Sequence, residues 1–175
     1  MNTQIIDKAK KIKLIATDVD GVLTEGFVFI DENSHEPFGK FNILDGYAVI
    51  MARDIGIKTV VISGRKSLAT EARCSKLGMD AFFTGVENKR QKVEELASVF
   101  NLNLDEIAYI GDDLIDIGAL NIVGFSCAPA NAVKDIQSRV DYVSNLQGGN
   151  GAFRDVVELI LKAQGRYEEV LFKHL

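Results

Sequence analysis

Two carboxylates, Asp18 and Asp20, lie one residue apart directly after a short apolar stretch at residues 14–16. Residues i and i+2 of an extended strand point to the same side, so a regular strand would bring the two side chains together. At about 4 Å and an effective dielectric near 20, two such charges repel by roughly 4 kcal/mol. A bound cation, or a proton on one carboxylate, would remove this repulsion. The alternative is a polar strand end that runs into a turn at Gly21.

Three further polar clusters follow stretches that have the pattern of buried strands. They are Ser63-Gly64-Arg65 after residues 58–62, Lys89 after Gly85, and Asp112, Asp113 and Asp116 after residues 107–110. Taken singly, these clusters have simpler interpretations: a turn, a solvated helix start and a helix cap. Ligand sites of open α/β sheets, however, lie beyond the carboxyl ends of the strands. The four clusters together therefore predict a single pocket at that edge.

The charge of this predicted pocket favours a divalent cation. Its five aspartates, with the opposite charges of Lys89 and Arg65, leave three negative charges, which would repel a phosphate. A bound Mg²⁺ would leave one negative charge, and a proton on one carboxylate would remove it. Because neither His nor Cys joins the cluster, its oxygen ligands favour Mg²⁺ over Zn²⁺.

The elements that must position these residues alternate along the chain. Strands are expected at about residues 13–16, 58–62, 81–83, 107–110, 123–125 and 142–143, and helices at about 5–11, 45–55, 67–77, 88–100, 113–120, 133–136 and 153–163. This order predicts an α/β fold with a doubly wound, mostly parallel, Rossmann-like sheet that is covered on both faces.

Two segments lie outside this alternation. Aromatic runs at residues 27–30 and 38–41 flank a polar tip at residues 31–36, which predicts a β-hairpin insertion over about residues 26–41. The connections after the first two strands are too short to hold a cap domain. The tail, about residues 164–175, has weak periodicity and is expected to be mobile or docked on a partner.

Length and composition limit the class of protein. The 175 residues predict a single domain over residues 1–175. A net charge of −5 argues against a nucleic-acid partner. No apolar run approaches the ~20 residues of a membrane span, and no signal peptide is expected, so no membrane partner is predicted. Cys74 and Cys127 have no metal-binding spacing and are interpreted as free thiols in a reducing cytoplasm.

Over nearly its whole length, the chain resembles the phosphatases of the haloacid dehalogenase (HAD) superfamily. The resemblance is strongest to the 3-deoxy-D-manno-octulosonate 8-phosphate (KDO 8-P) phosphatase family. The motifs that carry it are Asp18-Val19-Asp20-Gly21-Val22-Leu23-Thr24, Phe41-Asn42 with Asp45-Gly46, Ile62-Ser63-Gly64-Arg65, Asn88-Lys89, Tyr109-Ile110-Gly111-Asp112-Asp113-Leu114-Ile115-Asp116, and Gly148-Gly149-Asn150-Gly151-Ala152 with Arg154. The first and fifth motifs are highly specific together, whereas the others are weak alone.

The resemblance implies a role for each of the main polar residues. Asp18 would be the nucleophile that forms an aspartyl-phosphate, and Asp20 would be the general acid and base. The Ser63 hydroxyl and Lys89 would hold phosphoryl oxygens. Mg²⁺ would be bound by the Asp18 carboxylate, the Asp20 backbone carbonyl and Asp112, with Asp113 and Asp116 orienting this shell.

Residues implied to bind substrate are Gly64, Arg65, Asn88 and Arg73. Arg65 could form a bidentate pair with a sugar carboxylate, which suits an octulosonate phosphate. Arg73 and Lys76 are more simply exposed helix charges, with reach to a neighbouring site as the alternative. Asp45 is expected to be an N-cap rather than a ligand contact. Arg154 is left open between pinning the glycine-rich loop and touching the substrate.

The substrate implied by the resemblance is a small sugar-acid phosphate, KDO 8-P, whose hydrolysis belongs to lipopolysaccharide biosynthesis. Because an uncapped site is open to water, a homotetramer is expected in which neighbouring subunits complete each site. A phosphatase for a related nonulosonate 9-phosphate is the nearest alternative. A non-catalytic, phosphoaccepting receiver-like module is a second one, but its acceptor follows a middle strand and it lacks an acid at the Asp20 position. A non-catalytic regulatory domain is disfavoured by the complete acid set, and a dinucleotide-binding domain by the missing glycine motif.

Overall fold

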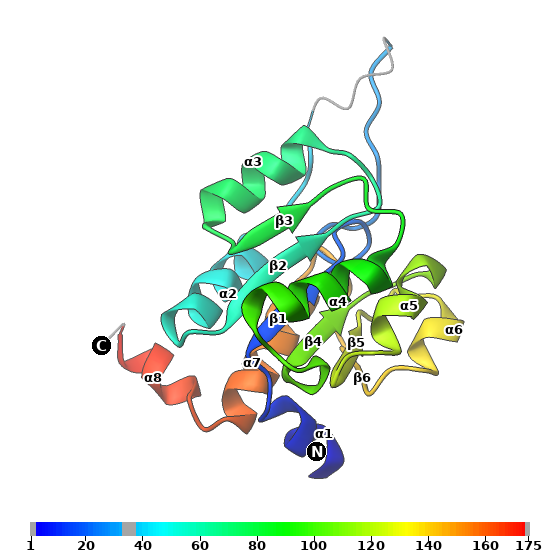
Figure 1. Ribbon diagram of the computed structural model, residues 1–175. Helices are drawn as coiled ribbons and strands as arrows, with labels where there is room; N and C mark the ends of the chain where they lie inside the picture. Colours follow the sequence, from blue (N-terminus) through cyan, green and yellow to red (C-terminus); the bar gives the residue numbers. More distant parts are fainter. Residues whose placement is uncertain (1–2, 33–37, 174–175) are drawn as a thin grey trace.

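The computed structural model describes residues 3–32 and 38–173, and within them six parallel strands form one sheet in the order β3-β2-β1-β4-β5-β6 (Figure 1). The strands are β1 (Leu14–Thr17), β2 (Lys58–Ile62), β3 (Ala81–Phe83), β4 (Ile107–Ile110), β5 (Phe125–Ala128) and β6 (Tyr142–Val143). This topology confirms the predicted parallel, doubly wound sheet. The first strand lies inside the sheet, between β2 and β4.

Helices cover both faces of the sheet (Figure 1). They are α1 (Thr3–Ala9), α2 (Ile43–Asp54), α3 (Leu68–Leu77), α4 (Lys89–Phe100), α5 (Ile117–Leu120), α6 (Lys134–Gln137), α7 (Ala152–Ala163) and α8 (Tyr167–Phe172), with 3-10 turns η1 (Leu104–Glu106) and η2 (Leu114–Asp116). One apolar core lies under α1, α2, α7 and α8, and a second under α4, α5 and α6. Among the described residues, no helix combines the length and apolar character that crossing a membrane requires.

The register of the central strands places their carboxyl ends at the same height in the sheet. Thr17, the last residue of β1, pairs with Val61 of β2 on one side and with Ile110 of β4 on the other. All four residues of β1 and of β4 are buried, as expected for strands covered on both faces. The loops that follow β1, β2 and β4 therefore begin at the same edge of the sheet.

Two predicted elements have different bounds in the structure. The helix expected at residues 113–120 is a 3-10 turn, η2, followed by the short helix α5. The strand expected at residues 123–125 begins only at Phe125. Gly124 instead forms the turn before it, with its N–H donating to the carbonyls of Leu104 and Ile107 and its Cα packed against the backbone of Asp105.

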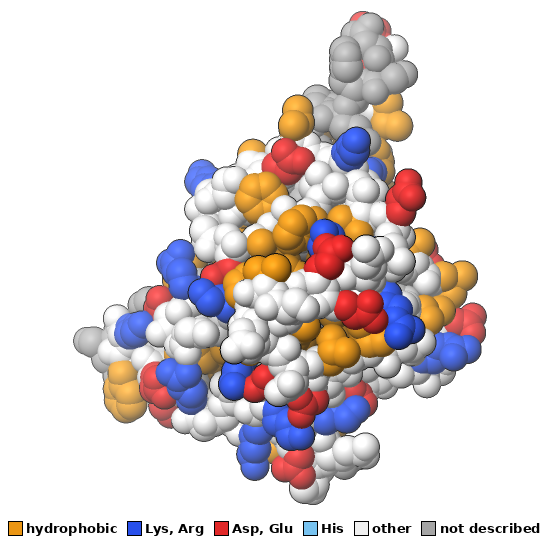
Figure 2. Space-filling view, viewed as in Figure 1, with side chains coloured by type: hydrophobic (Ala, Val, Ile, Leu, Met, Phe, Trp, Pro, Cys, Tyr) orange, Lys and Arg blue, Asp and Glu red, His pale blue; other side chains and the backbone are white. Residues whose placement is uncertain are grey.

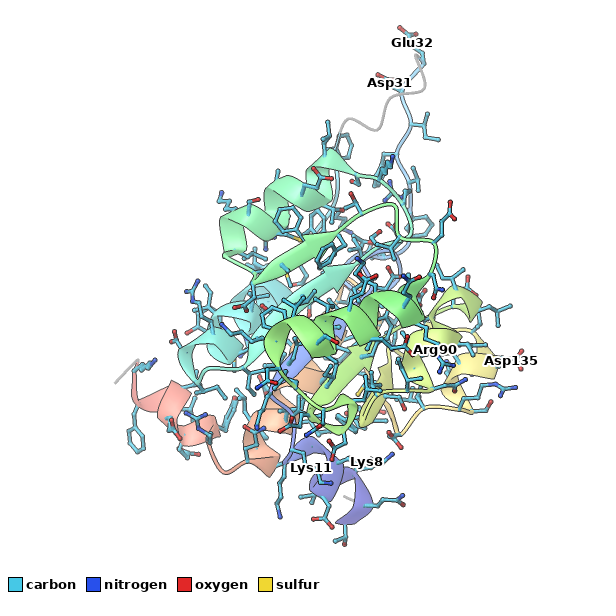
Figure 3. All side chains as sticks on the ribbon, in the orientation of Figure 1. Lys8, Lys11, Asp31, Glu32, Arg90 and Asp135 are labelled. Atoms are coloured by element: carbon cyan, nitrogen blue, oxygen red, sulfur yellow. The ribbon has the colours of Figure 1, made fainter. Side chains whose placement is uncertain are left out.

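The predicted β-hairpin is only partly supported. Its described parts, residues 26–32 and 38–41, carry no strand, and part of the predicted tip lies outside the described residues. The two arms lie beside each other, because the rings of Phe29 and Phe38 stack with centroids 5.0 Å apart. The arms project from the sheet body, with Asp31 and Glu32 at the outer end of the first arm (Figure 3). A two-stranded ribbon without further packing is marginal in water, which accounts for the missing strand pairs.

The expectation of a mobile or partner-docked tail is wrong for its described part. Residues 167–172 form α8, whose Val170 is buried in the core beneath α7. The Arg166 guanidinium donates to the carbonyl of Ile55 at 2.6 Å, and Lys173 pairs with Asp54 at 3.1 Å. The weak apolar periodicity of this segment was a poor guide because the helix is short and Val170 is its one fully buried residue, with Tyr167 partly buried beside the core.

Candidate active site

The chain turns away from the sheet directly after β1. The backbone N–H of Asp18 still donates to the carbonyl of Ile110 at 2.9 Å, which fixes Asp18 beside the end of β4. The carbonyl of Val19 then accepts from the N–H groups of Leu23 and Thr24 at 2.9 and 3.0 Å, closing a tight turn. The strand does not stay regular to Asp20, so the two carboxylates take different partners and the crowding expected of a continued strand is avoided.

The nucleophile candidate lies in a buried ion-pair network with Lys89. The Lys89 ammonium is 2.9 Å from Asp18 Oδ2 and 2.7 Å from Asp116 Oδ1. Only 2% of Lys89 and 3% of Asp18 is exposed, although Lys89 is the first residue of α4. A buried cation between two carboxylates places one positive charge inside the cluster of acids that the sequence brings to this edge of the sheet.

Asp116 is held by donors on every side. It accepts from the Tyr109 hydroxyl at 2.7 Å as well as from Lys89. Its other oxygen accepts from the backbone N–H groups of Asp112 and Asp113 at 3.1 and 3.3 Å. Asp116 therefore holds Lys89 and the loop after β4 in place. Asp113 is exposed and caps η2 through a 2.7 Å bond from the N–H of Leu114.

Three carboxylates converge as a metal site requires. One oxygen each from Asp18, Asp112 and Asp116 lies within 4.8 Å of the others. Gly21 makes room for this cluster, because a Cβ at that position would lie 1.9 Å from Oδ2 of Asp112. The all-oxygen donor set fits Mg²⁺. Since Asp116 is already saturated by donors, the residues that would hold the ion directly are Asp18 and Asp112.

The pKa shifts follow from placing these acids together. Burial, with the Asp116 charge, raises the pKa of Asp18 to about 6 against the opposing effect of Lys89. Burial, with the charges of Asp18, Asp116 and Asp113, raises the pKa of Asp112 to about 7. Burial alone would lower the pKa of Lys89, but Asp18 and Asp116 outweigh it and the net shift is upward. Without a cation the cluster is short of positive charge.

Asp20 lies outside this cluster and forms an ion pair with Arg65. The guanidinium contacts both carboxylate oxygens, with Nε 2.9 Å from Oδ2 and Nη2 2.6 Å from Oδ1. The side chains of Arg65 and Asp20 are 31% and 30% exposed, respectively. The Arg65 guanidinium, which was predicted to bind a carboxylate of the substrate, thus binds the carboxylate of Asp20 in this structure.

The turn after β2 brings the other predicted residues to the same edge. Ser63 is buried, and its backbone joins β3 through a 2.8 Å bond to the carbonyl of Phe83. Its hydroxyl contacts the backbone of Arg65 within the turn. Gly64 is exposed, and a Cβ there would lie 3.7 Å from Ile115 of η2, so the turn faces the loop after β4.

Two predicted substrate contacts are engaged elsewhere in the described structure. The Asn88 side chain caps α4 by accepting from the N–H of Gln91 at 3.0 Å. The Arg73 guanidinium packs on Gly46 and donates to the carbonyl of Asn42 at 3.3 Å, at the start of α2. Neither side chain has a described contact with the acidic cluster, because each is used to fix a helix end.

The expected N-cap at Asp45 is wrong, since Asn42 caps α2 by accepting from the N–H of Leu44. Asp45 is instead buried and accepts from the N–H groups of Gly151 and Arg154 at 3.2 and 3.0 Å, at the start of α7. Burial raises the pKa of Asp45 despite these bonds. The Arg154 side chain pairs with Glu158 at 2.8 Å, so Asp45 is what holds the end of the glycine-rich loop.

Sequence reasoning also missed a pocket beside Asp20 and Arg65. It lies between the two arms and the start of α3. Its lining residues are Asp20, Thr24, Glu25, Phe27, Val28, Phe29, Phe38, Gly39, Lys40, Phe41, Arg65, Ser67, Ala69 and Thr70. Lys40 of one arm pairs with Glu25 of the other at 2.8 Å. The aromatic walls therefore enclose two ion pairs, Lys40 with Glu25 and Arg65 with Asp20, whose charges balance. The signal in the sequence was the aromatic pattern of residues 27–41.

Comparison with known proteins places this site in a class. Residues 82–154 match the family model of haloacid dehalogenase-like hydrolases. The KDO 8-P phosphatase of Salmonella typhi is 38% identical over 97% of this chain and 89% of its own. The KDO 8-P phosphatase of Haemophilus influenzae is 38% identical over 91% of this chain and 88% of its own.

Solved structures agree with the sequence relatives. The crystal structure of KDO 8-P phosphatase from Moraxella catarrhalis, in complex with magnesium ion, phosphate ion and KDO, has a TM-score of 0.96 at 34% identity and covers 100% of both chains. A cobalt-bound form of the Haemophilus influenzae enzyme has a TM-score of 0.88 at 38% identity, over 91% of this chain and 93% of that one. This protein belongs to the KDO 8-P phosphatase family of HAD-like hydrolases.

Proposed function

We propose that the chain is a Mg²⁺-dependent phosphomonoesterase whose substrate is KDO 8-P, which it hydrolyses to KDO and phosphate. The observation that carries this is the buried Lys89, which lies between Asp18 and Asp116 at the edge where Asp112 also converges. The activity of its relatives and the magnesium, phosphate and KDO bound by the Moraxella catarrhalis enzyme support the same function. Residues 1–175 would act as one hydrolase domain.

The reaction would proceed in two displacements at phosphorus. In the reacting complex Asp20 would be protonated and released from its bidentate pair with Arg65. A carboxylate oxygen of Asp18 attacks phosphorus, and the bond to the sugar oxygen breaks while the Asp20 carboxyl gives its proton to that oxygen. Asp20 then takes a proton from a water molecule, which attacks the same phosphorus and breaks its bond to Asp18. Inorganic phosphate leaves, and Asp18 and Asp20 return to their starting states.

The remaining polar residues would stabilise charge during both steps. Lys89 contacts Asp18 and so lies next to the phosphoryl group that Asp18 would accept. The Ser63 hydroxyl and the N–H groups of the turn at Gly64 would donate to phosphoryl oxygens. Mg²⁺, held by Asp18, Asp112 and the Asp20 carbonyl, would neutralise negative charge on the phosphoryl group.

The sugar acid would lie beside Asp20 and Arg65, at the mouth of the pocket between the arms and α3. Arg65 must give up at least one contact with Asp20 before that carboxyl can serve a leaving oxygen. A substrate carboxylate would offer Arg65 an equivalent partner, since both are planar two-oxygen acceptors. The acid on the sugar would thereby both anchor the substrate and free Asp20. Asn88 and Arg73 would contribute only to a substrate that reaches beyond this pocket or to a neighbouring site.

We further propose a homotetramer in the cytoplasm, with sites completed by neighbouring subunits. Exposed apolar side chains on the arms support the assembly: Phe27, Val28, Phe29, Ile30 and Phe38 are all exposed, and Figure 2 shows hydrophobic side chains on this projection. The described part of the chain holds no cap over the site, so a second subunit would exclude water from it. Cys74 and Cys127 are buried free thiols, which suits a reducing compartment.

The test of the function is phosphate release from a panel of substrates. KDO 8-P, a nonulosonate 9-phosphate and a neutral hexose 6-phosphate would be compared by kcat/KM, with Mg²⁺ and with excess chelator. We expect KDO 8-P to be preferred by at least about tenfold and all activity to be lost on chelation. Equal kcat/KM for the neutral sugar phosphate would contradict the role of Arg65, and activity that survives chelation would contradict the metal site.

A further inference from the structure

The loop between β5 and α6, residues 129–133, joins three loops at the edge of the sheet that holds the candidate site. The Val133 N–H donates to the carbonyl of Asp112 at 3.0 Å, which ties this loop to the one after β4. The Ala130 N–H donates to the carbonyl of Leu146 at 2.9 Å, which ties it to the loop before α7. The third connection, to the turn after β1, is made by the Asn131 side chain.

Asn131 uses both ends of its amide at once. Its Nδ2 donates to the carbonyl of Gly21 at 2.9 Å, and its Oδ1 accepts from the N–H of Gly148 at 2.6 Å. A primary amide can donate to a carbonyl and accept from an N–H at the same time, which Ala and Asp cannot do. The side chain therefore matches the two backbone groups that face it.

The two glycines bonded by Asn131 are themselves in close contact with the site. A Cβ on Gly148 would lie 1.8 Å from the carbonyl oxygen of Gly21, and a Cβ on Gly21 would lie 1.9 Å from Oδ2 of Asp112. Gly148, Gly21 and the Asp112 carboxylate are thus stacked without intervening side chains. A shift of the Gly21 peptide would be transmitted directly to the Asp112 carboxylate and to the neighbouring Asp20.

The loop that carries Asn131 is fixed from behind. The Gln137 amide donates to the carbonyls of Ala130 and Ala132, at 2.9 and 2.8 Å, on either side of Asn131. These bonds hold the backbone of the loop independently of the Asn131 side chain. Truncating that side chain therefore removes the link to Gly21 without removing the loop's own support.

We propose that Asn131 is a positioning residue for the metal site. By bonding Gly21 and Gly148 together, it holds the turn after the nucleophile against Asp112, so that Asp18, the Asp20 carbonyl and Asp112 stay in reach of one ion. This inference rests on the proposed function, because it assigns Asn131 to the Mg²⁺ site of that function. Groups that orient metal ligands typically change metal affinity or activity by about 10- to 100-fold when removed.

The test compares Asn131→Ala, Asn131→Asp and the control Asn150→Ala. Asn150 lies in the same glycine-rich loop but bonds the carbonyl of Gly148 and Glu25, at 3.2 and 3.4 Å, rather than Gly21. Three quantities are measured: kcat and KM for KDO 8-P, the dissociation constant of Mg²⁺ by calorimetry, and the rise in Tm that Mg²⁺ produces. Asn131→Asp keeps an acceptor for Gly148 but cannot donate to Gly21, and it preserves the side-chain volume if the alanine variant does not fold.

We expect Asn131→Ala to weaken Mg²⁺ binding about tenfold and both Asn131 variants to lower kcat about tenfold, with KM little changed. Asn150→Ala should match the wild type. A lower Tm in chelator, with unchanged Mg²⁺ affinity and kcat, would mean that Asn131 only supports the fold and would overturn the proposal. Absence of Mg²⁺ binding by the wild type would instead overturn the proposed function, and this inference with it.

Discussion

The chemistry of this protein rests on how neighbouring aspartates are kept apart. Asp18 contacts Lys89, Asp20 contacts Arg65, and Asp116 is surrounded by donors. The turn at Val19 separates the first two, which would otherwise repel each other. Asp18 and Asp20 therefore have different cationic partners, so each can take its own role in the proposed two-step mechanism.

Asp20→Asn tests the proton-transfer role. The amide cannot give or take a proton at the leaving oxygen, so kcat should fall about 10²- to 10⁴-fold. Mg²⁺ binding should persist, because only the backbone carbonyl of Asp20 is assigned to the metal. The value of kcat and the dissociation constant of Mg²⁺, by calorimetry, are measured on the same sample. Asp135→Asn, at an exposed position in the first turn of α6, serves as the matched control. A variant with near wild-type kcat would show that Asp20 is not the acid.

The raised pKa values predict how stability depends on pH in the absence of metal. Burial and the neighbouring acids raise the pKa of Asp112 from its ordinary value of 3.8 to about 7 in the fold, so the folded chain holds a proton that the unfolded chain loses. This stabilisation is complete below the lower value and is lost as pH rises toward and through 7. Mg²⁺ binds the ionised form, so its effect on Tm should grow over the same range.

The measurement is Tm from pH 5 to 8, in chelator and in Mg²⁺, for the wild type and Asp112→Asn. In chelator, the wild type should lose stability with rising pH relative to the variant. The variant should show little Mg²⁺-dependent rise at any pH. Parallel curves for the two proteins in chelator would rule out the assigned pKa of Asp112.

At the scale of elements, the site is built where parallel strands end together. β1 and β4 are in register at Thr17 and Ile110, so Asp18 and Asp112 leave neighbouring strands at the same level. The turn after β1 then depends on Gly21, whose φ of 80° is in the left-handed region and whose Cα faces Asp112. Backbone geometry, rather than side-chain bulk, sets the size of the metal site.

Gly21→Ala should therefore lose activity out of proportion to stability. Gly56→Ala is the matched control, because Gly56 has a φ of 79° with no heavy atom within 4 Å of its Cβ position. Both variants should lose about 1–2 kcal/mol from the left-handed backbone, and the clash with Asp112 adds a further loss for Gly21→Ala alone. Only Gly21→Ala should also displace Asp112, lowering kcat at least about tenfold. Unfolding in urea measures the loss of stability, and phosphate release measures kcat. Equal kcat for the two variants would count against the close packing at Gly21.

The strand ends were predictable from sequence because apolar runs and the residues that follow them are adjacent in the chain. Asp18, Ser63, Lys89 and Asp112 were placed in this way. The role of Asp45 was not predictable from sequence, because its partners Gly151 and Arg154 are more than a hundred positions away in the chain. Asn131 was missed for the same reason, since a lone Asn in a loop is ordinary until Gly21 is beside it.

At the scale of the whole molecule, the two ends of the sheet differ. The arms project with Asp31 and Glu32 at the outer end of the first, whereas Lys8 and Lys11 lie at the opposite end of the molecule (Figure 3). Residues 27–30 of the first arm are all apolar, with Phe27 72% and Ile30 65% exposed. Side chains of this kind on a projection beside an uncapped pocket are typical of a surface that another subunit covers.

The substitution Ile30→Ser, on the exposed first arm but outside the lining of the pocket beside Asp20, should weaken the proposed tetramer. The mass in solution, measured by light scattering, should fall from four chains to one or two, and kcat/KM should fall because neighbouring subunits no longer complete the sites. Val99→Ser is the control, since Val99 is 76% exposed on α4, away from the arms. A wild-type mass of one chain, with full activity, would refute the assembly.

The central claim is that Asp18 accepts the phosphoryl group, and the rate of phosphate release by Asp18→Asn tests it most directly. The amide keeps nearly the same shape and volume but is not nucleophilic, so hydrolysis of KDO 8-P at saturating Mg²⁺ should fall by at least about 10⁴-fold, to the background of the assay. Phosphate release by this variant at a rate near that of the wild type would contradict the account.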